Sequence, residues 1–159
     1  MTGLADLCYF SARKLSSSRG GGICTDSMEI FKELEAFIPL YEGFLTYGGM
    51  SIREVEAMAV GLYETLDETI ISQSPTFIKY LVDSLDAKGI PMIKPAGVLG
   101  AHVDAMQLCA HIPQTEYPAG ALAAALFLIS GVRGMERGSI SNQRDEYGNE
   151  TYADMELLR

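Results

Sequence analysis

Leu4-Ala5-Asp6-Leu7-Cys8-Tyr9-Phe10-Ser11-Ala12-Arg13-Lys14 is the stretch that decides the fold of this chain. The run from Leu4 to Phe10 is short, apolar and partly aromatic, which predicts a buried β-strand. Residues 11–19 are polar and include three consecutive serines, so a loop is expected there. Gly20-Gly21-Gly22 follows, and 21–25 reads as a second strand. Lys14 is therefore expected just beyond a strand end, where functional sites of α/β folds lie.

Ser11 and Lys14 stand three residues apart, and their side chains together suit one kind of ligand. A lysine amine can form an imine with a carbonyl cofactor, and a serine hydroxyl can bond that cofactor's phosphate. Arg13 adds positive charge, and charge with partial burial favours the nucleophilic free amine. The pattern points to pyridoxal phosphate. The plain alternative for these four residues alone is a loop with an exposed lysine.

Ser-x-x-Lys also occurs in serine β-lactamases and penicillin-binding proteins, where Ser11 would be an acyl nucleophile. That function needs a helix beginning at the serine, together with Ser-Asp-Asn and Lys-Thr-Gly. Neither tripeptide occurs, and Ser141-Asn142-Gln143 is the nearest approach. We therefore set this alternative aside.

Composition excludes some classes of protein. The formal net charge of −9 argues against nucleic acid as a partner, because a phosphate-binding face should be basic. The N-terminus lacks a signal-peptide pattern, and the apolar segment 119–129 is too short to span a bilayer, so a cytoplasmic protein with no membrane contact is expected. Cys8, Cys24 and Cys109 are scattered, which favours buried free thiols in a reducing compartment and no metal site.

Capping and periodicity signals predict the remaining elements. Asp26 with Glu29 predicts the start of a helix carrying apolar residues from Ile30 to Ile38, which Pro39 and Gly43 end or kink. Further helices are expected from Ser51-Ile52-Arg53-Glu54 to about Asp67, from Ser74-Pro75 to Lys88-Gly89, and from Pro118 to Gly131. Strands are expected within 90–93, 99–103 and 132–137, with an exposed loop over 137–152.

A change of composition near residues 67–75 predicts a boundary. We expect 1–69 to be the C-terminal part of a large cofactor-binding domain. We expect 70–159 to be a truncated small α+β domain, with two or three antiparallel strands against helices. The chain begins at one strand and ends in another, which predicts a fragment of an α/β protein. Exposed apolar faces on the helices at 119–129 or 30–38 would then be expected.

Five motifs, in order along the chain, resemble the aromatic amino-acid β-eliminating lyases, the family of tyrosine phenol-lyase and tryptophanase. They are Ser11-Ala12-Arg13-Lys14, Gly20-Gly21-Gly22, Tyr41-Glu42-Gly43-Phe44-Leu45-Thr46-Tyr47-Gly48-Gly49, Glu56-Ala57-Met58-Ala59-Val60-Gly61-Leu62 and Gly131-Val132-Arg133-Gly134-Met135-Glu136-Arg137-Gly138. The resemblance covers nearly the whole chain and corresponds to the middle and later part of a longer enzyme. It implies a fragment of the aspartate-aminotransferase-like fold of pyridoxal-phosphate-dependent enzymes.

The resemblance implies roles for individual residues. Lys14 corresponds to the lysine that bonds pyridoxal 5'-phosphate and then moves protons at the substrate α-carbon. Ser11 corresponds to the serine that bonds the cofactor phosphate, and Arg13 stands where the family has a second lysine. Arg159 corresponds to the arginine that holds the substrate α-carboxylate, a task that suits a bidentate guanidinium.

Substrate choice in this family is implied by Arg137 and Phe44. Arginine in the Met-Glu-Arg-Gly context is typical of the tyrosine phenol-lyase branch, where it contacts the phenol hydroxyl, whereas Phe44 is more similar to tryptophanase. We weight Arg137 more heavily because a charged donor reports more directly on substrate chemistry. A surface arginine paired with Glu136 or Glu146 is the alternative. Tyr47 resembles a residue lining the site near a subunit boundary, or belongs to an ordinary turn.

Two departures from the family stand out. A monovalent cation such as K+ is implied near the glycine pair, but Arg19 occupies that stretch. Gly97-Val98-Leu99-Gly100 stands in place of a Gly-Gly-His-Ala motif, so the family histidine is missing. His102 and His111 are isolated histidines and are expected to be structural.

The resemblance thus implies a carbon-carbon lyase of amino-acid metabolism that acts by β-elimination on an aromatic amino acid, releasing phenol, pyruvate and ammonia from tyrosine. The alternatives are a tryptophanase-like enzyme that releases indole, and a non-catalytic remnant. The full-length parent is expected to be a homo-oligomer that binds a small amino acid. The acidic partner of the cofactor ring lies upstream in the family, so this chain alone is expected to be inactive.

Overall fold

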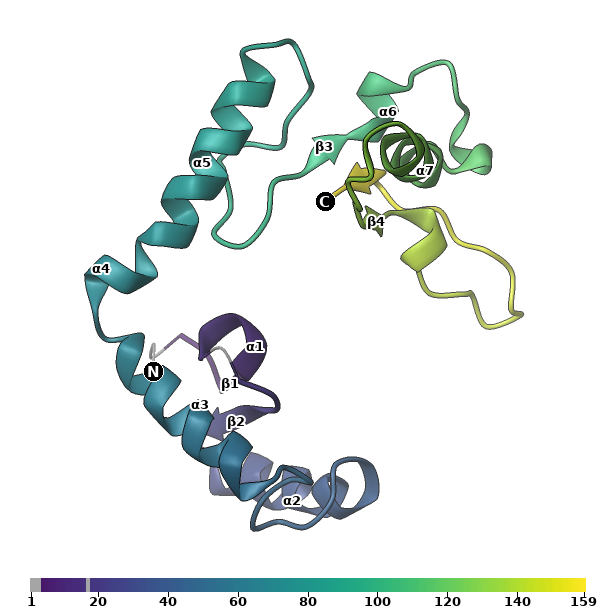
Figure 1. The fold of residues 1–159 in the computed structure, drawn as a ribbon. Coiled ribbons are helices and arrows are strands. Elements are labelled where there is room, and N and C mark those ends of the chain that lie inside the picture. Colours follow the sequence, from purple (N-terminus) through teal and green to yellow (C-terminus); the bar gives the residue numbers. More distant parts are fainter. Residues whose placement is uncertain (1–3, 17) are drawn as a thin grey trace. The chain divides into compact units, whose positions relative to one another are not determined.

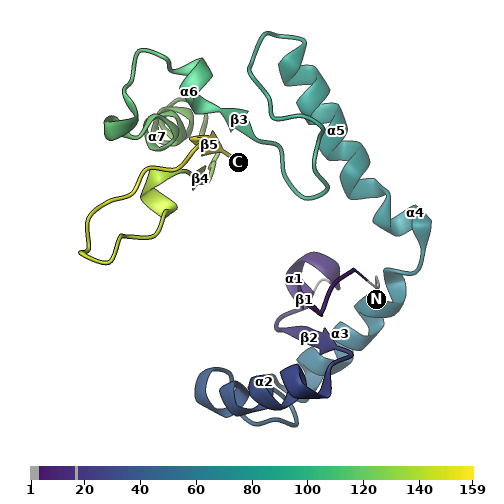
Figure 2. The same cartoon turned by 180° about the vertical axis from the view of Figure 1, so that it is seen from behind.

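The computed structural model describes residues 4–16 and 18–159 of the chain (Figures 1 and 2). These residues form two compact units that divide after Ser72, the second being Gln73–Arg159. Each unit mixes helices and strands, which confirms the α/β class. Within the described residues, no helix combines the length and the apolar character needed to cross a membrane.

The first unit contains the antiparallel hairpin of β1 (Leu7–Ser11) and β2 (Gly21–Thr25). Both strands were predicted. The predicted burial of β1 is wrong, because Tyr9 is 78% exposed and Cys8 is also exposed. Apolar composition indicated the strand correctly, but burial depends on which elements cover it.

A short helix, α1 (Ala12–Leu15), replaces the predicted loop after β1. Ser11 is extended and occupies the N-cap, and the Ser16 amide donates to the Ala12 carbonyl over 2.8 Å. Serine content indicated a loop, but contact with a neighbouring helix stabilises the helical turn. A Cβ atom at Gly61 would lie only 2.0 Å from the Ser16 carbonyl oxygen, so the two backbones touch there.

The helix α2 (Met28–Tyr41) begins one residue later than Asp26 predicted. Ser27 is the N-cap, and its hydroxyl accepts from the Ile30 amide over 3.3 Å. Pro39 does not end the helix, which continues to Tyr41. Because Pro39 lies in the last turn, it removes a single amide donor there. None of the α2 residues is buried.

The helix α3 (Ile52–Glu64) has the predicted capping box. Glu54 accepts from the Ser51 amide over 2.8 Å, and the Ser51 hydroxyl accepts from the Glu54 amide. The helix ends before Asp67, which instead caps the short α4 (Glu68–Ile71). The buried residue of α3 is Gly61, which lies at the contact with α1.

The second unit begins with α5 (Gln73–Asp86), one residue before the predicted cap. Ser74 is not the N-cap, and its hydroxyl donates to the Val98 carbonyl over 2.7 Å. Gly89, with φ of +81°, follows the helix. The two strands predicted within 90–103 shrink to a bridge between Met92 and Val103 and to β3 (Val103–Asp104).

A three-stranded antiparallel sheet in the order β3-β5-β4 organises the second unit. Its other strands are β4 (Glu136–Arg137) and β5 (Leu157–Leu158), with α6 (Ala105–Leu108) and α7 (Pro118–Ser130) beside it. The limits of α7 confirm the prediction, with Pro118 at its start and Gly131 in left-handed geometry after its end. Short 3-10 turns cover Gln114–Glu116 and Ser139–Ser141.

The two helices that were predicted to have exposed apolar faces, α2 and α7, both have them. On α7, Leu128 and Ile129 are 83% and 86% exposed. On α2, Phe31, Phe37 and Leu40 are exposed as well. These faces have no cover among the described residues of their own units.

The contact between Gly61 and Ser16 predicts an unusual effect of Gly61→Ala. Alanine normally stabilises a helix interior over glycine by about 1 kcal/mol. Here we expect a loss of about 1–3 kcal/mol, because the added methyl group would collide with a backbone carbonyl. Thermal unfolding followed by circular dichroism measures the difference. The exposed neighbour Val60→Ala should stay within about 0.5 kcal/mol of the parent, and a stabilised Gly61→Ala would contradict the packing described.

Candidate functional site

Ser11, Arg13 and Lys14 lie together where β1 passes into α1. The Ser11 side chain makes no capping hydrogen bond to the helix, and the Arg13 and Lys14 side chains are exposed. Neither forms an ion pair with any residue that the structure describes. The partial burial expected of Lys14 is therefore not seen in this unit. The hydroxyl, the guanidinium and the amine are all available to a ligand.

The β-lactamase alternative required a helix at Ser11, and the structure does have one. It is only four residues long, and the two tripeptides remain absent from the sequence. The turn geometry alone therefore does not revive that function.

A shallow open hollow of about 570 Å³ lies beside α1 and the start of α3. Its lining residues are Arg13, Ser18, Arg19, Arg53, Glu54 and Ala57. Glu54 lies 3.8 Å from Arg19, and hydrogen bonds from Ser51 lower its pKa, with Arg19 adding a smaller effect. One acidic residue and three arginines thus line the hollow, so its lining carries a net positive charge in a chain of net charge −9. Sequence inspection missed Arg53, because its capping-box setting indicated only a helix start.

The loop between α2 and α3 presents Phe44 and Tyr47. Their ring centroids are 5.7 Å apart, and the side chains are 67% and 42% exposed. The neck of the loop is closed by glycines, since a Cβ at Gly49 would lie 2.1 Å from the Glu42 carbonyl oxygen. Gly49 has a φ of +74°, which an L side chain rarely adopts. The two aromatic rings are therefore held together at the tip of a tight loop.

In the second unit, strand register brings two predicted residues onto one face. Arg137 pairs with Leu157, and side chains alternate along a strand, so Arg137 and Arg159 share a face. Asp104 also pairs with Leu157, which places His102 on that face too. The opposite face carries the buried Leu158.

Arg159 is held by several contacts. Its backbone exchanges two hydrogen bonds of 2.8 Å with Met135, and one guanidinium nitrogen donates to the Leu99 carbonyl over 3.0 Å. A Cβ at Gly100 would lie 2.4 Å from its Nε atom, so the side chain crosses directly over that glycine. The stretch 97–100 therefore holds the Arg159 side chain in place.

His102 lies near both arginines. Burial lowers its pKa from the ordinary value of 6.5, and the positive charges of Arg159 and then Arg137 lower it further. A neutral imidazole beside two cations results at neutral pH. Arg137 itself is exposed and forms no ion pair with Glu136, Glu146 or any other described residue. The pairing named as the alternative for Arg137 is thus not observed.

A buried carboxylate fixes the segment that follows Arg137. Glu156 is fully buried, and one of its oxygens accepts from the Ser139 amide over 2.8 Å. A Cβ at Gly138 would lie 2.3 Å from its other oxygen, which has no hydrogen-bond partner among the described residues. Sequence inspection missed Glu156, because nothing in the composition of residues 155–159 marks a buried acid.

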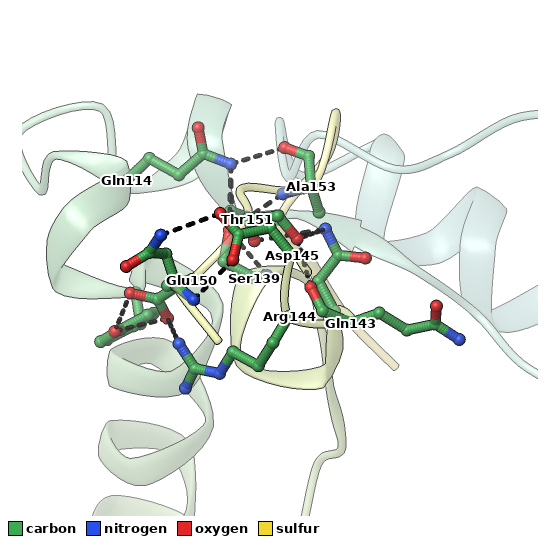
Figure 3. Close-up of polar contacts among 12 residues, drawn as sticks. Gln114, Ser139, Gln143, Arg144, Asp145, Glu150, Thr151 and Ala153 are labelled. Carbon is green, nitrogen blue, oxygen red and sulfur yellow. Dashed lines mark hydrogen bonds and ion pairs between the residues drawn. The ribbon is translucent and has the colours of Figure 1, made fainter. Parts of the chain in front are cut away.

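The segment 137–152, predicted to be an exposed loop, is bonded to itself and to its surroundings (Figure 3). Gln114 donates to the Ala153 carbonyl over 2.6 Å, and the Ala153 amide donates to the Ser139 hydroxyl. The Thr151 hydroxyl donates to the Gln143 carbonyl. Arg144 faces Glu150 (Figure 3), and its Nη1 atom lies 3.9 Å from Oε1 of that carboxylate. The loop is exposed yet ordered, because its polar groups satisfy one another.

Comparison with known proteins gives the homology of the chain. No protein-family model matches it. It is 41% identical over 157 residues to the tyrosine phenol-lyase of Lacrimispora saccharolytica, covering 97% of this chain and 34% of that protein. It is 37% identical over 160 residues to a probable tryptophanase of Aeropyrum pernix, covering 100% of this chain and 34% of that protein. The tryptophanase of Salinibacter ruber is 41% identical over 140 residues, or 88% of this chain and 30% of that protein.

The chain is therefore homologous, over nearly its whole length, to a segment of the tyrosine phenol-lyases and tryptophanases. It spans about a third of the length of these relatives. The resemblance drawn from the five motifs is confirmed. Identity of 41% to members with either name does not separate the two kinds of lyase.

The shared face of Arg137 and His102 predicts a change on removing one charge. Arg137→Gln should raise the pKa of His102 toward 6.5, because one of the two cations is lost while burial remains. NMR titration of the imidazole measures the midpoint. Because the pKa of His102 is lower in the folded state than in the unfolded state, the unfolded state binds the proton more readily. The free energy of unfolding is therefore highest above about pH 6.5 and decreases as the pH falls.

The matched control is Arg133→Gln, which removes an exposed arginine from the same segment. It should leave the His102 midpoint unchanged. An unchanged His102 midpoint in Arg137→Gln would show that Arg137 lies away from the imidazole. It would contradict the conclusion that the strand register places both side chains on one face of the sheet.

Proposed function

We propose that this chain is the cofactor-anchoring and substrate-holding segment of a pyridoxal-phosphate-dependent carbon-carbon lyase that acts on an aromatic amino acid by β-elimination. One observation carries the proposal. Lys14 follows Ser11 by three residues at the end of β1, in a chain 37–41% identical to tyrosine phenol-lyases and tryptophanases. The corresponding fold would be that of the aspartate aminotransferases, with the first unit belonging to the large domain and the second to the small one.

The donor set of the first unit fits a phosphorylated aldehyde. Lys14 offers a primary amine that no described carboxylate neutralises. Ser11 offers a hydroxyl not used in capping, and Arg13 offers a guanidinium to a phosphate. When bound, the cofactor supplies an electron sink for carbanion chemistry at the substrate α-carbon. Lys14 would bond the aldehyde carbon and later carry a proton to or from that α-carbon, while Ser11 and Arg13 would hold the phosphate.

The second unit would hold the substrate. Arg159, fixed through Leu99 and Met135, presents a guanidinium that suits a bidentate carboxylate contact. Arg137 has no ion-pair partner among the described residues and would donate to a phenol oxygen as negative charge develops there. In the first unit, Phe44 and Tyr47, in contact at a loop tip, would offer aromatic surface to a substrate ring. Arg19 faces Glu54 in the stretch of the implied cation site, which argues against a K+ ion there.

The exposure of Lys14 taken alone favours an ordinary surface lysine. The homology outweighs it, because the chain spans about a third of its relatives and the exposure describes only this third. A remnant with no catalytic role is the second candidate, favoured by Leu99 standing in place of the family histidine.

Tyrosine is the proposed substrate, with phenol, pyruvate and ammonia as products, because Arg137 is a hydrogen-bond donor for a phenol oxygen. Indole release from tryptophan is the alternative, favoured by Phe44. An oligomeric parent enzyme is part of the same proposal, since the exposed apolar faces of α2 and α7 are of the kind that subunit contacts cover.

The proposal predicts that pyridoxal phosphate added to the chain forms a covalent linkage to Lys14. The measurement is the visible absorption band of the lysine-bound cofactor. Lys14→Ala should abolish the band, whereas Lys32→Ala, which removes an exposed lysine of α2, should retain it. Ser11→Ala should weaken pyridoxal phosphate binding by about ten- to a hundredfold and leave pyridoxal binding unchanged, since a lost hydrogen bond to a charged group costs about 1.5–3 kcal/mol. Equal bands in both lysine variants would overturn the assignment.

Activity requires more chain than these 159 residues in our proposal, so the polypeptide alone should release no pyruvate from tyrosine. A chimera in which residues 1–159 replace the matching third of the Lacrimispora saccharolytica enzyme should release phenol. In it, Arg137→Leu should lower phenol release by about a hundredfold, the typical cost of removing a transition-state donor. Arg133→Gln should have no such effect. Release of indole from tryptophan without phenol from tyrosine would favour the tryptophanase alternative.

A further inference from the structure

Two cysteines of the hairpin face each other across its strands. Cys8 of β1 pairs directly with Cys24 of β2. Both are free thiols and both are exposed, contrary to the prediction of buried cysteines. Cys109, which is buried as predicted, belongs to the second unit. Residues paired across an antiparallel ladder project from the same face, so the two exposed thiols are neighbours.

The ladder also indicates how close they come. The Ala12 amide donates to the Gly20 carbonyl over 3.0 Å, in the same register that pairs Cys8 with Cys24. Because hydrogen-bonded pairs alternate along the ladder, the cysteines, four residues further along each strand, are again a hydrogen-bonded pair. Such pairs have Cα atoms about 5.5 Å apart. Disulfides bridge Cα atoms about 4.4–6.8 Å apart, so the pair lies within reach.

The Cβ atoms must approach each other by about 1 Å or more before a disulfide can form. Opposed residues in a sheet have Cβ atoms about 4.5–5.5 Å apart, with hydrogen-bonded pairs at the long end, whereas a disulfide prefers about 3.5–4.5 Å. A bond formed here would be exposed and somewhat distorted. Disulfides of that kind are readily reduced and serve as labile or regulatory bonds, in contrast to structural ones.

We propose that Cys8 and Cys24 form a reversible redox site, a dithiol that closes to a disulfide across the hairpin when it meets a small-molecule disulfide such as oxidised glutathione. One cysteine thiolate attacks the oxidant and releases one molecule of reduced glutathione, which leaves a mixed disulfide. The second cysteine attacks the protein sulfur of that mixed disulfide and releases the second reduced glutathione. The protein loses two electrons and two protons, and the oxidant takes them up.

The position of this pair gives the bond a structural consequence. Cys8 lies three residues before Ser11 on β1, and Cys24 lies three residues after Gly21 on β2. The disulfide would tie the open end of the hairpin, while the Ala12–Gly20 hydrogen bond already closes the other end. The redox site requires neither cofactor nor substrate, and both thiols are exposed in the first unit by itself. A test on these 159 residues therefore does not depend on the proposed lyase function.

The test is oxidation of the intact chain with oxidised glutathione, followed by intact mass and peptide mapping. We expect the mass of the monomer to fall by two hydrogen atoms and peptide mapping to find one peptide pair joined through Cys8 and Cys24. Reduced glutathione should reverse the change fully. Cys8→Ser and Cys24→Ser should each stop at a stable glutathione adduct, because the resolving thiol is missing. Cys109→Ser should still close the disulfide. Stable glutathione adducts on both Cys8 and Cys24 of the parent chain, or only intermolecular disulfides, would overturn the proposal.

A second measurement does not depend on redox potential. Phenylarsine oxide binds two neighbouring thiols through arsenic, with loss of one water molecule. The parent chain and Cys109→Ser should bind it alike. Either single variant of the pair should bind about a hundredfold or more weakly, because two linked contacts gain that much from effective concentration. Equal binding by Cys8→Ser and the parent would show that the two thiols do not act together.

Discussion

The close approach of Gly61 to the Ser16 carbonyl is the constraint on which the first unit depends. Because position 61 has no side chain, the backbone of α1 rests directly on α3, with Ser16 and Gly61 both buried. That contact converts a serine-rich segment into a helical turn. The position of α1 then determines where the amine of Lys14 and the hydroxyl of Ser11 lie with respect to the hairpin. The proposed chemistry of the lysine is therefore set by a glycine on another helix.

In the second unit, polar contacts fix the positions of the proposed substrate-binding residues. Its short strands contribute few ladder bonds, so polar groups carry much of the order. Buried Glu156 fixes the Ser139 amide behind Arg137, and the carbonyl of Leu99 fixes Arg159. A buried acid with one unpaired oxygen costs free energy of folding. Here the segment that it fixes is the one that carries the arginine proposed to recognise the substrate.

Sequence patterns predicted the elements whose signals are local. The capping box of Ser51 and Glu54 and the proline and glycine limits of α7 were correct, because each is set by residues within a few positions. The start of α2 was misplaced by one residue, because two adjacent side chains could cap the same helix. The helix α1 and the exposure of β1 were missed, because both depend on contacts with distant residues. The strands near Met92 and Val103 were overestimated, because pairing partners limit strand length and composition does not.

The candidate site was predicted unevenly, for similar reasons. Ser11 and Lys14 carry a motif, and the homology of the chain supports the family from which their roles were inferred. The hollow formed by Arg13, Arg19 and Arg53 has no motif, because the three arginines come from separate parts of the chain. Likewise Glu156 carries no local signal, and the neighbourhood of His102 depends on strand register.

The central claim is that the amine of Lys14 exists to condense with an aldehyde. Borohydride reduction of the chain in the presence of substoichiometric pyridoxal phosphate, followed by peptide mapping, tests this claim most directly, because it makes any linkage permanent and identifies its position. The account predicts that the label lies on Lys14 and that Ser11→Ala reduces it. A label spread evenly over Lys14, Lys32, Lys79, Lys88 and Lys94 would contradict it and leave Lys14 an ordinary surface lysine.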